Sequence, residues 1–485
     1  MADNQKTHIL IIPYPAQGHI IPLLDLIHNL ASTSKLTITI VITPKNLPLI
    51  SPLVSLFPFI VTPLVLPFPS YHGIPQGKEN TKDLPPASFK QIMPAFAKLM
   101  DPLRHWFESH PSPPVAIISD IFLGWTHNFS LQLGIHRIVF SPSGAFGLSV
   151  IYSLWKNMPK KKNQDQDQDQ NDVVLFEDVP GCPKFPWWQL SPVFRSYVEG
   201  DADSDFIKQG FWDDMASWGL LINSFDDMEK IYLDHLSSSF GYDGRIWAVG
   251  PLVSQTKVEN RGGSSSIEVD KLLSWLDTCQ NNEVVYVSFG TQAVLTNREM
   301  EVIAEGLEKS RVRFIWSVKG QVGDHGMVPH GFEDHLSGCG LVIKGWAPQV
   351  LILKHRAVGA FLTHCGWNSV LEGVVTGVKL LAWPMGADQF SNATLIVDHL
   401  KVGTRVCEGS DMVPNSCELA RILAESVNQH EISRKKIMKL QSKALESLSD
   451  NGSSSKALVS LVNKLCELKI EPKIESISKG NNNLE

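Results

Sequence analysis

The sequence lacks the long apolar run that a membrane-spanning helix needs, because none of its apolar stretches reaches about 18 uninterrupted residues. The N-terminal stretch HILIIPYPA is short, is broken by Pro13 and Pro15, and has no small-residue cleavage site. The last residues, KIESISKGNNNLE, are polar. We therefore expect neither a secretory signal peptide nor a C-terminal membrane anchor.

Paired cysteines and clustered basic residues are also scarce. The seven cysteines are scattered, none forms a CxxC pair, and their number is odd, which favours reduced thiols in a cytoplasmic protein. The net charge is −7, and the main basic run is Lys160-Lys161-Lys162, so nucleic acid is not an expected partner. We expect a cytoplasmic monomer that acts on small molecules.

A chain of 485 residues, 43% of them hydrophobic and 19% charged, has the composition of a globular protein with two or three domains. HILIIPYP predicts a buried strand, a turn with Gly18 follows, and IIPLLDLIHNLAS has helical spacing. Three more strands are predicted at 36–43, 115–120 and 136–142. This alternation predicts a parallel sheet with helices on both faces.

The same alternation restarts in the second half, from VVYVSFGT through RFIWSV and VGAFLTH to KLLAWP. Polar, low-complexity residues 160–172 predict a flexible surface loop, and the Pro, Gly and Ser of 249–266 predict an interdomain linker. The prediction is an α/β protein with two such domains and a cleft between them. Its segments are an N-terminal domain at 1–248, a C-terminal domain at 267–455, a helix at 456–469 and a disordered tail at 470–485.

The run from Trp346 to Gln389 combines groups that suit the parts of a nucleotide sugar. Trp346 follows the strand LVIKG and thus lies at a carboxyl end, where α/β folds bind ligands and an indole can stack on a base. A tryptophan buried in the core is the alternative interpretation. The pair Asp388-Gln389, after the strand KLLAWP, offers acceptors and donors for sugar hydroxyls.

A predicted helix start lies in the middle of this run. The strand ends at Thr363-His364, a turn with Gly366 follows, and the helix begins near Trp367. Backbone N–H groups there, with the side chains of Asn368 and Ser369, would bind a diphosphate, and His364 adds a donor. Asn368 and Ser369 could equally be simple helix caps. Glu372, one turn further on, can accept from ribose hydroxyls or can lie on a solvated face.

Two residues at strand ends of the first predicted sheet form a candidate catalytic pair. His19 lies near the start of the first helix, where the N-terminus disfavours imidazolium and keeps a base neutral. Asp120 ends the strand VAIISD at the same sheet edge, where its carboxylate would orient the ring. Any one of sixteen histidines is more often structural, and Asp120 is what favours catalysis here.

The run 346–389 resembles the signature box of plant family-1 UDP-glycosyltransferases, and the similarity extends over most of the chain. The resemblance implies a GT-B fold, two Rossmann-like domains facing across a cleft. It also implies stacking of uracil on Trp346, a backbone contact from Ala347, and ribose contacts from Gln349 and Glu372. It assigns the diphosphate to His364, Asn368 and Ser369, and the sugar to Trp367, Asp388 and Gln389. Further donor-site residues are expected at Gly18, Ser288, Gly290, Thr291 and Gly366.

The family's chemistry implies one inverting displacement, with His19 and Asp120 as the catalytic dyad. His19 would deprotonate the acceptor hydroxyl, and transfer from UDP-glucose would give a β-glucoside. A terminal Gln of the box is typical of glucose users. Where many members have a Thr that touches the sugar, this chain has Ser141-Pro142-Ser143, and either serine could replace it. UDP-rhamnose, UDP-xylose and UDP-galactose remain alternative donors.

The resemblance is greatest to a group that acts on flavonols, often at the 7-hydroxyl, and on hydroxybenzoates, so a small phenolic acceptor is expected. Aromatic residues after strand ends and in Pro-rich loops of the N-terminal domain could line its pocket, although such residues are more often part of the core. These candidates are Phe122, Trp125, Phe146, Phe185, Trp187 and Trp188.

No metal or other cofactor is expected beside the UDP-sugar co-substrate. Asp165-x-Asp167-x-Asp169 matches a metal motif but lies in a QD repeat. Residues 201–212 begin like a calcium loop, with Phe206 in place of its glycine and Trp212 in place of its glutamate. A dinucleotide oxidoreductase is disfavoured because no GxGxxG follows the first strand. A non-catalytic nucleotide-sugar-binding protein remains an alternative that the presence of His19 and Asp120 disfavours.

Overall fold

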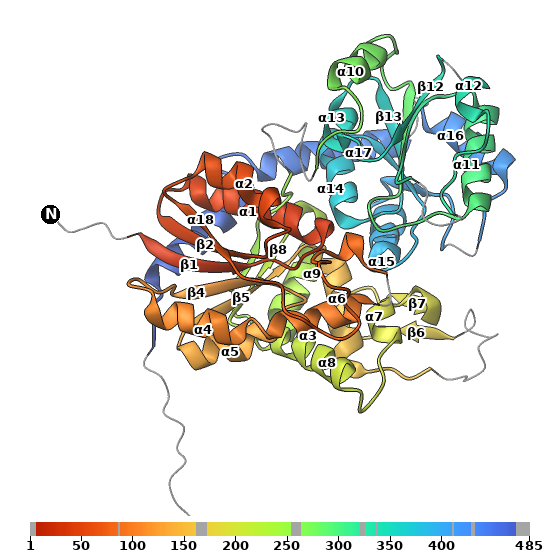
Figure 1. The fold of residues 1–485 in the computed structure, drawn as a ribbon. Helices are drawn as coiled ribbons and strands as arrows, with labels where there is room; N and C mark the ends of the chain where they lie inside the picture. The colour runs from red at the N-terminus through yellow and green to blue at the C-terminus, as the bar shows by residue number, and fades with distance from the viewer. Residues whose placement is uncertain are drawn as a thin grey trace, which may run out of the picture.

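Two parallel sheets form the frame of the molecule (Figure 1). The computed structural model describes residues 6–85, 88–161, 172–253, 263–320, 325–335, 338–409, 412–427 and 432–471. Most of the predicted surface loop, the middle of the predicted linker and residues 472–485 of the predicted tail lie outside these ranges. The two sheets lie on either side of the linker in the sequence, while the exact domain boundaries stay predictions.

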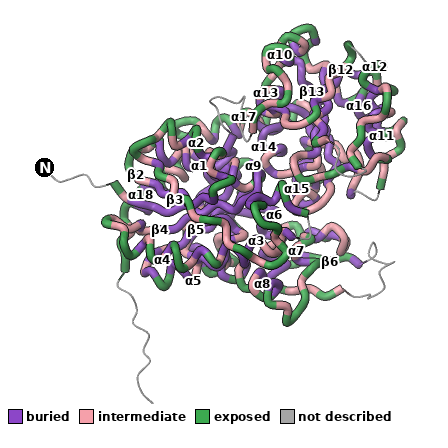
Figure 2. Tube along the Cα trace, in the orientation of Figure 1, coloured by how far each residue is buried: buried purple, intermediate pink, exposed green. Residues whose placement is uncertain are grey.

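The N-terminal sheet has seven strands in the order β3-β2-β1-β4-β5-β8-β9, all parallel. Its strands are mostly apolar and, apart from the edge strand β3, mostly buried, as expected for a parallel sheet covered on both faces (Figure 2). They are β1 (Thr7–Ile12), β2 (Leu36–Ile42), β3 (Val61–Val65), β4 (Ala116–Asp120), β5 (His136–Ser141), β8 (Gly219–Ile222) and β9 (Ile246–Ala248). The helices on this half are α1 (Gln17–Ser32), α2 (Leu47–Leu56), α3 (Phe89–Ala97), α4 (Met100–Ser109), α5 (Thr126–Leu133), α6 (Ala145–Asn157), α7 (Pro192–Arg195), α8 (Ala202–Met215) and α9 (Asp226–Ser239).

The C-terminal sheet has six strands in the order β12-β11-β10-β13-β14-β15, also all parallel. They are β10 (Val284–Ser288), β11 (Arg313–Val318), β12 (Gly340–Lys344), β13 (Val358–Thr363), β14 (Lys379–Ala382) and β15 (Gly403–Arg405). Its helices are α10 (Val269–Asp277), α11 (Asn297–Ser310), α12 (Phe332–His335), α13 (Gln349–Lys354), α14 (Trp367–Thr376), α15 (Gln389–Thr394), α16 (Ser416–Ser426) and α17 (Ile432–Ser447). A π-helical turn, η6 (Leu395–His399), continues α15.

The chain returns to the N-terminal half at its end. Helix α18 (Ser453–Glu467) packs against β9, and its Leu461 and Leu465 belong to the apolar cluster that contains Ile9 and Ile38 of the N-terminal sheet. Figure 1 shows this blue helix beside the red strands β1 and β2. Helix α18 overlaps the helix predicted at 456–469 and packs on the N-terminal sheet, while the predicted division of the chain into segments stays a prediction.

The predicted strands of both halves are confirmed, but several strands have no clear signal in the sequence. β3 contains Pro63, which a sheet tolerates at its edge, where β3 lies. β8, β9 and β15 span three or four residues each. A short antiparallel pair, β6 (Val173–Leu175) with β7 (Lys184–Pro186), follows α6 and leads into the 3₁₀ turn η4 (Trp187–Gln189). A further 3₁₀ turn, η1 (Thr81–Asp83), precedes α3.

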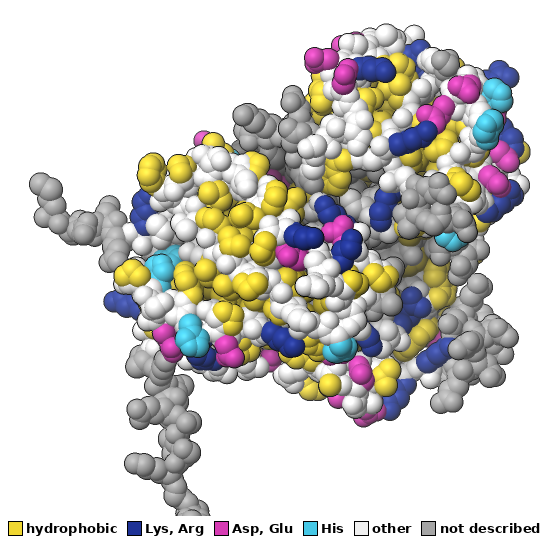
Figure 3. Space-filling model, viewed as in Figure 1, with side chains coloured by type: hydrophobic (Ala, Val, Ile, Leu, Met, Phe, Trp, Pro, Cys, Tyr) yellow, Lys and Arg dark blue, Asp and Glu magenta, His cyan; other side chains and the backbone are white. Residues whose placement is uncertain are grey.

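The surface is mixed in character. On the face drawn in Figure 3, basic and acidic side chains are interspersed over both halves. Of the described helices, none is long and apolar enough to cross a bilayer.

Gly124 allows α8 to pack, at Gly210, against the turn that follows β4, and the pair of glycines gives a test of this packing. A Cβ at Gly124 would overlap the backbone carbonyl of Gly210, whereas a Cβ at Gly210 would lie 3.7 Å from Gly124 Cα. Gly124→Ala should therefore lower the free energy of unfolding by about 1–3 kcal/mol. Gly210→Ala, inside α8, should be neutral or stabilising by up to about 1 kcal/mol. Urea unfolding of both variants checks this, and equal midpoints would contradict the packing.

Candidate active site

A cavity lies between the two domains and is lined by residues from the carboxyl ends of strands in both sheets. Most of the predicted residues line it: Gly18, His19, Ser143, Ser288, Gly290, Thr291, Trp346, Ala347, Gln349, His364, Gly366, Trp367, Asn368, Ser369, Glu372, Asp388 and Gln389. Sequence reasoning missed Gln17, Ile21, Tyr286, Gln292, Ser317, Gly345, Val350 and Ala387. Of these, Tyr286 and Ser317 lie on strands β10 and β11, whose carboxyl ends could have indicated them.

The structure joins His19 and Asp120. His19 Nδ1 lies 2.8 Å from Asp120 Oδ2, and the backbone N–H of Phe122 donates to Asp120 Oδ1 at 2.9 Å. Asp120 is completely buried, while the His19 side chain is 18% exposed and borders the cavity. Because a carboxylate accepts hydrogen bonds, the proton of neutral His19 resides on Nδ1. Nε2 is then the unprotonated nitrogen that can accept a proton.

The start of α14 borders the cavity on the C-terminal side. Gly366 precedes it with no side-chain cap, so the first backbone N–H groups of this ten-residue helix can bind an anion. His364 stands beside them, and its Nδ1 has no hydrogen-bond partner in the described part of the chain. Desolvation lowers the pKa of His364 to about 4, so this ring is neutral near pH 7. Asn368 Nδ2 reaches across to the carbonyl of Gly18 at 3.0 Å.

A hydrogen-bonded group lies between α13 and α14. The amide nitrogen of Gln349 donates to Glu372 Oε2 at 2.6 Å and to Ser369 Oγ at 3.0 Å. The hydroxyl of Tyr286 donates to Gln349 Oε1 at 3.3 Å. The structure thus brings together Gln349 and Glu372, the two residues expected at the ribose. It also connects Ser369, expected at the diphosphate, to this group instead.

Trp346 lines the cavity rather than the core. It directly follows Gly345 at the end of β12, and its backbone exchanges two hydrogen bonds of 2.8 Å with Ser266. Gly263 lies against the indole, since a Cβ there would come within 3.1 Å of the ring. The alternative of a core tryptophan is therefore excluded by its position.

The far end of the cavity contains the Asp388-Gln389 pair at the start of α15. Ser143 Oγ, from the N-terminal domain, donates to Asp388 Oδ2 at 2.7 Å. Gln389 Oε1 accepts from the N–H groups of Met385 and Gly386 at 2.8 and 3.0 Å, which fixes the orientation of its amide. Ser141 does not line the cavity, because it is buried and its hydroxyl donates to the carbonyl of Ser143.

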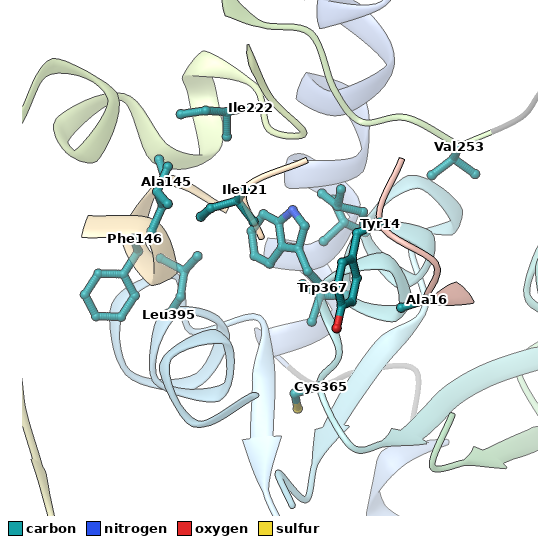
Figure 4. Close-up of a cluster of buried hydrophobic side chains, with 14 of the residues drawn as sticks. Tyr14, Ala16, Ile121, Ala145, Phe146, Ile222, Val253, Cys365, Trp367 and Leu395 are labelled. Atoms are coloured by element: carbon teal, nitrogen blue, oxygen red, sulfur yellow. The ribbon is translucent and has the colours of Figure 1, made fainter. Parts of the chain in front are cut away.

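The indole of Trp367 is directed away from the cavity into the N-terminal domain, where it lies among buried side chains that include Tyr14 and Ile121 (Figure 4). Its Nε1 donates to the carbonyl of Asn223 at 2.7 Å. A Cβ at Gly144 would lie 2.5 Å from the ring. The indole therefore joins the domains, and the backbone of Trp367 is what α14 can offer to a ligand.

Of the expected acceptor residues, Phe122 lies beside the candidate base, with ring centroids 4.8 Å apart. The others lie elsewhere. Trp125 and Phe146 are 4% and 0% exposed and belong to the core, as does Phe185, so burial corrects the expectation that they face a pocket. Trp187 packs on Phe194 within its own domain.

Trp188 contacts the second domain through Phe390, with ring centroids 5.1 Å apart.

The acidic motifs show no metal geometry in the described ranges. Among those residues, no group of three or more His, Cys, Asp or Glu side chains converges on a possible ion site. Asp201 caps α8 by accepting from Ser204 N, and Asp203 accepts from the Tyr71 hydroxyl. The aspartates at 165, 167 and 169 lie outside the described residues.

Comparisons with known proteins identify the family. A family model described as "UDP-glucoronosyl and UDP-glucosyl transferase" matches residues 269–445. A UDP-glycosyltransferase from Stevia rebaudiana is 55% identical over 469 residues, covering 95% of this chain and 98% of that protein. A flavonol 3-O-glucosyltransferase from Arabidopsis thaliana is 52% identical and covers 93% of this chain and 94% of that protein.

Among solved structures, Arabidopsis thaliana UGT89C1 complexed with UDP-L-rhamnose matches with a TM-score of 0.80 at 39% identity, over 95% of this chain and 100% of that one. Full-length identity of 52–55% to curated glycosyltransferases establishes the family. The chain belongs to the plant family-1 UDP-glycosyltransferases, enzymes of the GT-B fold.

The lowered pKa of His364 gives a stability test. In an unfolded chain a histidine titrates near about pH 6.5, so between that pH and about 4 the unfolded chain binds a proton that the folded chain does not. The free energy of unfolding must fall as the pH drops through this window. Wild type should lose about 2 kcal/mol more than His364→Gln between pH 7 and pH 5.

Urea unfolding at the two pH values measures this difference. His335→Gln, which removes an exposed histidine of the same domain, is the matched control and should behave as wild type. Equal pH dependence in wild type and His364→Gln would show that His364 is not desolvated.

Proposed function

We propose that this UDP-glycosyltransferase moves glucose from UDP-glucose to a hydroxyl of a small phenolic acceptor of the flavonol type, with inversion to a β-glucoside. The observation that carries the proposal is the His19–Asp120 hydrogen bond of 2.8 Å at the wall of the cavity that also contains the predicted donor residues. The flavonol class is supported by the name of the 52% identical relative.

His19 acts as general base and Asp120 as its partner. Nε2 of His19 takes the proton of the acceptor hydroxyl, and the buried Asp120 stabilises the imidazolium that forms. The acceptor oxygen then attacks the anomeric carbon from the face opposite UDP. Phe122, beside the imidazole, offers an aromatic surface to a planar phenolic ring.

UDP is held by the C-terminal domain. Uracil stacks on Trp346, and ribose hydroxyls bind the Gln349–Glu372 pair. The diphosphate binds the N–H groups at the start of α14 and the neutral ring of His364, which can donate a hydrogen bond without a net charge. As UDP departs, the positive end of the α14 dipole stabilises its growing negative charge.

Glucose is the favoured donor sugar because Gln389 lines the cavity while backbone N–H groups hold its amide oxygen, which leaves its amide nitrogen to donate to a sugar hydroxyl. The backbone N–H groups of Met385 and Gly386 both donate to Gln389 Oε1. Asp388 adds a carboxylate, so the cavity has both donors and acceptors for hexose hydroxyls. A relative named as a glucosyltransferase, 52% identical, supports this choice. Ser143 orients Asp388 from across the cleft.

UDP-rhamnose is the second candidate, and one specific observation favours it. Pro142 lines the cavity next to Ser143 and offers an apolar surface where a 6-deoxy sugar carries a methyl group. UGT89C1, complexed with UDP-L-rhamnose, is a structural match at 39% identity. The two donors therefore have to be compared directly.

The first test concerns the dyad. His19→Ala should lower kcat for flavonol glucosylation by about 10²–10⁴-fold, since the base is lost, and Asp120→Asn should lower it strongly as well. The Kd of UDP should stay unchanged in both variants, because UDP binds the other domain. UDP release and calorimetric UDP titration measure these quantities. His28→Ala, on the same helix α1, is the matched control, and equal turnover of His19→Ala and wild type would overturn the mechanism.

The second test concerns the donor sugar. With one flavonol, kcat/KM should be higher for UDP-glucose than for UDP-rhamnose, UDP-xylose or UDP-galactose. Ser143→Ala removes the hydrogen bond to Asp388 and should lower kcat/KM for UDP-glucose about three- to tenfold. A preference of wild type for UDP-rhamnose would replace glucose by the second candidate.

A further inference from the structure

We propose that Trp188, on the η4 turn of the N-terminal domain, is a positioning residue that sets the place of the donor-sugar residues Asp388 and Gln389. It touches neither substrate and acts through α15. The inference rests on the proposed function in one respect, the binding of the sugar by these two residues. It assigns to Trp188 a role in donor selectivity instead of the acceptor contact expected from the sequence.

The first observation is the contact itself. The ring of Trp188 meets that of Phe390 edge-on, with centroids 5.1 Å apart and planes at 84°. Phe390 directly follows Gln389 in α15 and is 3% exposed. Figure 1 shows β7 and α7, which flank η4, next to α15. A shift of the Trp188 ring would therefore pass directly to the first turn of α15.

The Trp188 ring also lies against Gly409 of the second domain. A Cβ at Gly409 would lie 2.8 Å from the indole, so only glycine permits this approach. The N–H of Gly409 donates to the carbonyl of Pro384, and Trp383 Nε1 donates to the carbonyl of Gly409. Residues 383–384 end the strand segment that leads into the Asp388-Gln389 pair. Trp188 thus lies against Phe390, which follows the Asp388-Gln389 pair, and against Gly409, which is hydrogen-bonded to the residues that precede the pair.

A hydrogen bond also links η4 to the second domain. Gln189 Nε2 donates to Glu408 Oε2 at 2.9 Å, and Glu408 also pairs with Arg405. Arg405 in turn pairs with Asp398 of η6 at 2.6 Å. Two neighbouring residues of η4, Trp188 and Gln189, therefore contact the second domain, which fixes the position of η4 on that domain.

The N-terminal domain holds the start of α15 from a second direction through α6. Ser143, just before α6, donates to Asp388, and Gly147 of α6 approaches closely enough that a Cβ would lie 3.3 Å from Ser391 Oγ. The first turn of α15 is therefore packed between α6 and η4. By contrast, the Gln349–Glu372 pair is held by Tyr286 and Ser369 of its own domain. Loss of Trp188 should affect the sugar end of the site and spare uracil and ribose.

The test measures, for three variants of η4, the binding of UDP alone and the use of complete UDP-sugars. Trp188→Ala removes the contact, and Trp188→Phe keeps an aromatic edge at Phe390. Trp187→Ala is the matched control, because the Trp187 ring packs on Phe194 inside the N-terminal domain. For each variant, calorimetry gives the Kd of UDP. Steady-state kinetics with one flavonol give kcat and KM for UDP-glucose and for its C4 epimer UDP-galactose.

Trp188→Ala should raise KM for UDP-glucose about three- to tenfold, as expected for loss of an aromatic pair, and reduce the glucose-over-galactose preference by a similar factor. The Kd of UDP should not change. Trp188→Phe should recover most of the preference, and Trp187→Ala should keep it. Equal weakening of UDP and UDP-glucose, an unchanged preference, or the same effect from Trp187→Ala would each overturn the proposal.

Gln389→Ala separates this proposal from the function on which it rests. If Gln389→Ala changes the glucose-over-galactose preference and Trp188→Ala does not, the role of Trp188 alone is wrong. If Gln389→Ala leaves that preference intact, the assignment of the sugar site is wrong, whatever Trp188→Ala does.

Discussion

The hydrogen bonds that cross the cleft are the constraint on which the active site depends. Asn368, at the start of α14, donates to the carbonyl of Gly18, the residue next to the candidate base His19. Trp367 donates to the carbonyl of Asn223, and Ser143 donates to Asp388. Each bond joins the C-terminal domain to the N-terminal domain, at the first turn of α1 for Gly18 and at a loop after a strand for Asn223 and Ser143. A displacement needs the base and the anomeric carbon within about 3–3.5 Å of the reacting oxygen, and these bonds fix the two walls relative to each other.

Asp120 is fixed from within its own domain as well. The buried guanidinium of Arg137 donates to the carbonyl of Asp120 at 3.3 Å and to Ser119 Oγ at 2.8 Å. It also lies 2.6 Å from the carboxyl group of Asp214, and burial raises the pKa of that carboxyl. Arg137 thus fixes the backbone and the neighbouring side chain at the end of β4, while His19 is hydrogen-bonded to the Asp120 carboxylate. The carboxylate that orients the base is thus itself oriented by the backbone and by a buried cation.

Much of this arrangement could be predicted because parallel strands bring their carboxyl ends to one edge. That rule alone placed His19 beside Asp120, although about a hundred residues separate them in the chain. It also placed Trp346, at the end of β12, in the cavity. The rule failed where the direction of a side chain decided the outcome. Phe146 follows a strand end but faces the core, and the indole of Trp367 enters the other domain.

The nucleotide end of the predicted donor site is easier to predict from the sequence than the sugar end, for a physical reason. Trp346, Gln349 and Glu372 are contributed by one continuous segment, and Gln349 is hydrogen-bonded to Glu372, so their spacing is visible in the sequence. Asp388 and Gln389 belong to the same segment, yet Ser143 and Trp188 of the other domain support them. Contacts between distant segments leave no periodicity or motif. If Asp388 and Gln389 bind the sugar as proposed, selectivity depends in part on Ser143 and Trp188, which lie outside the donor segment and in the other domain.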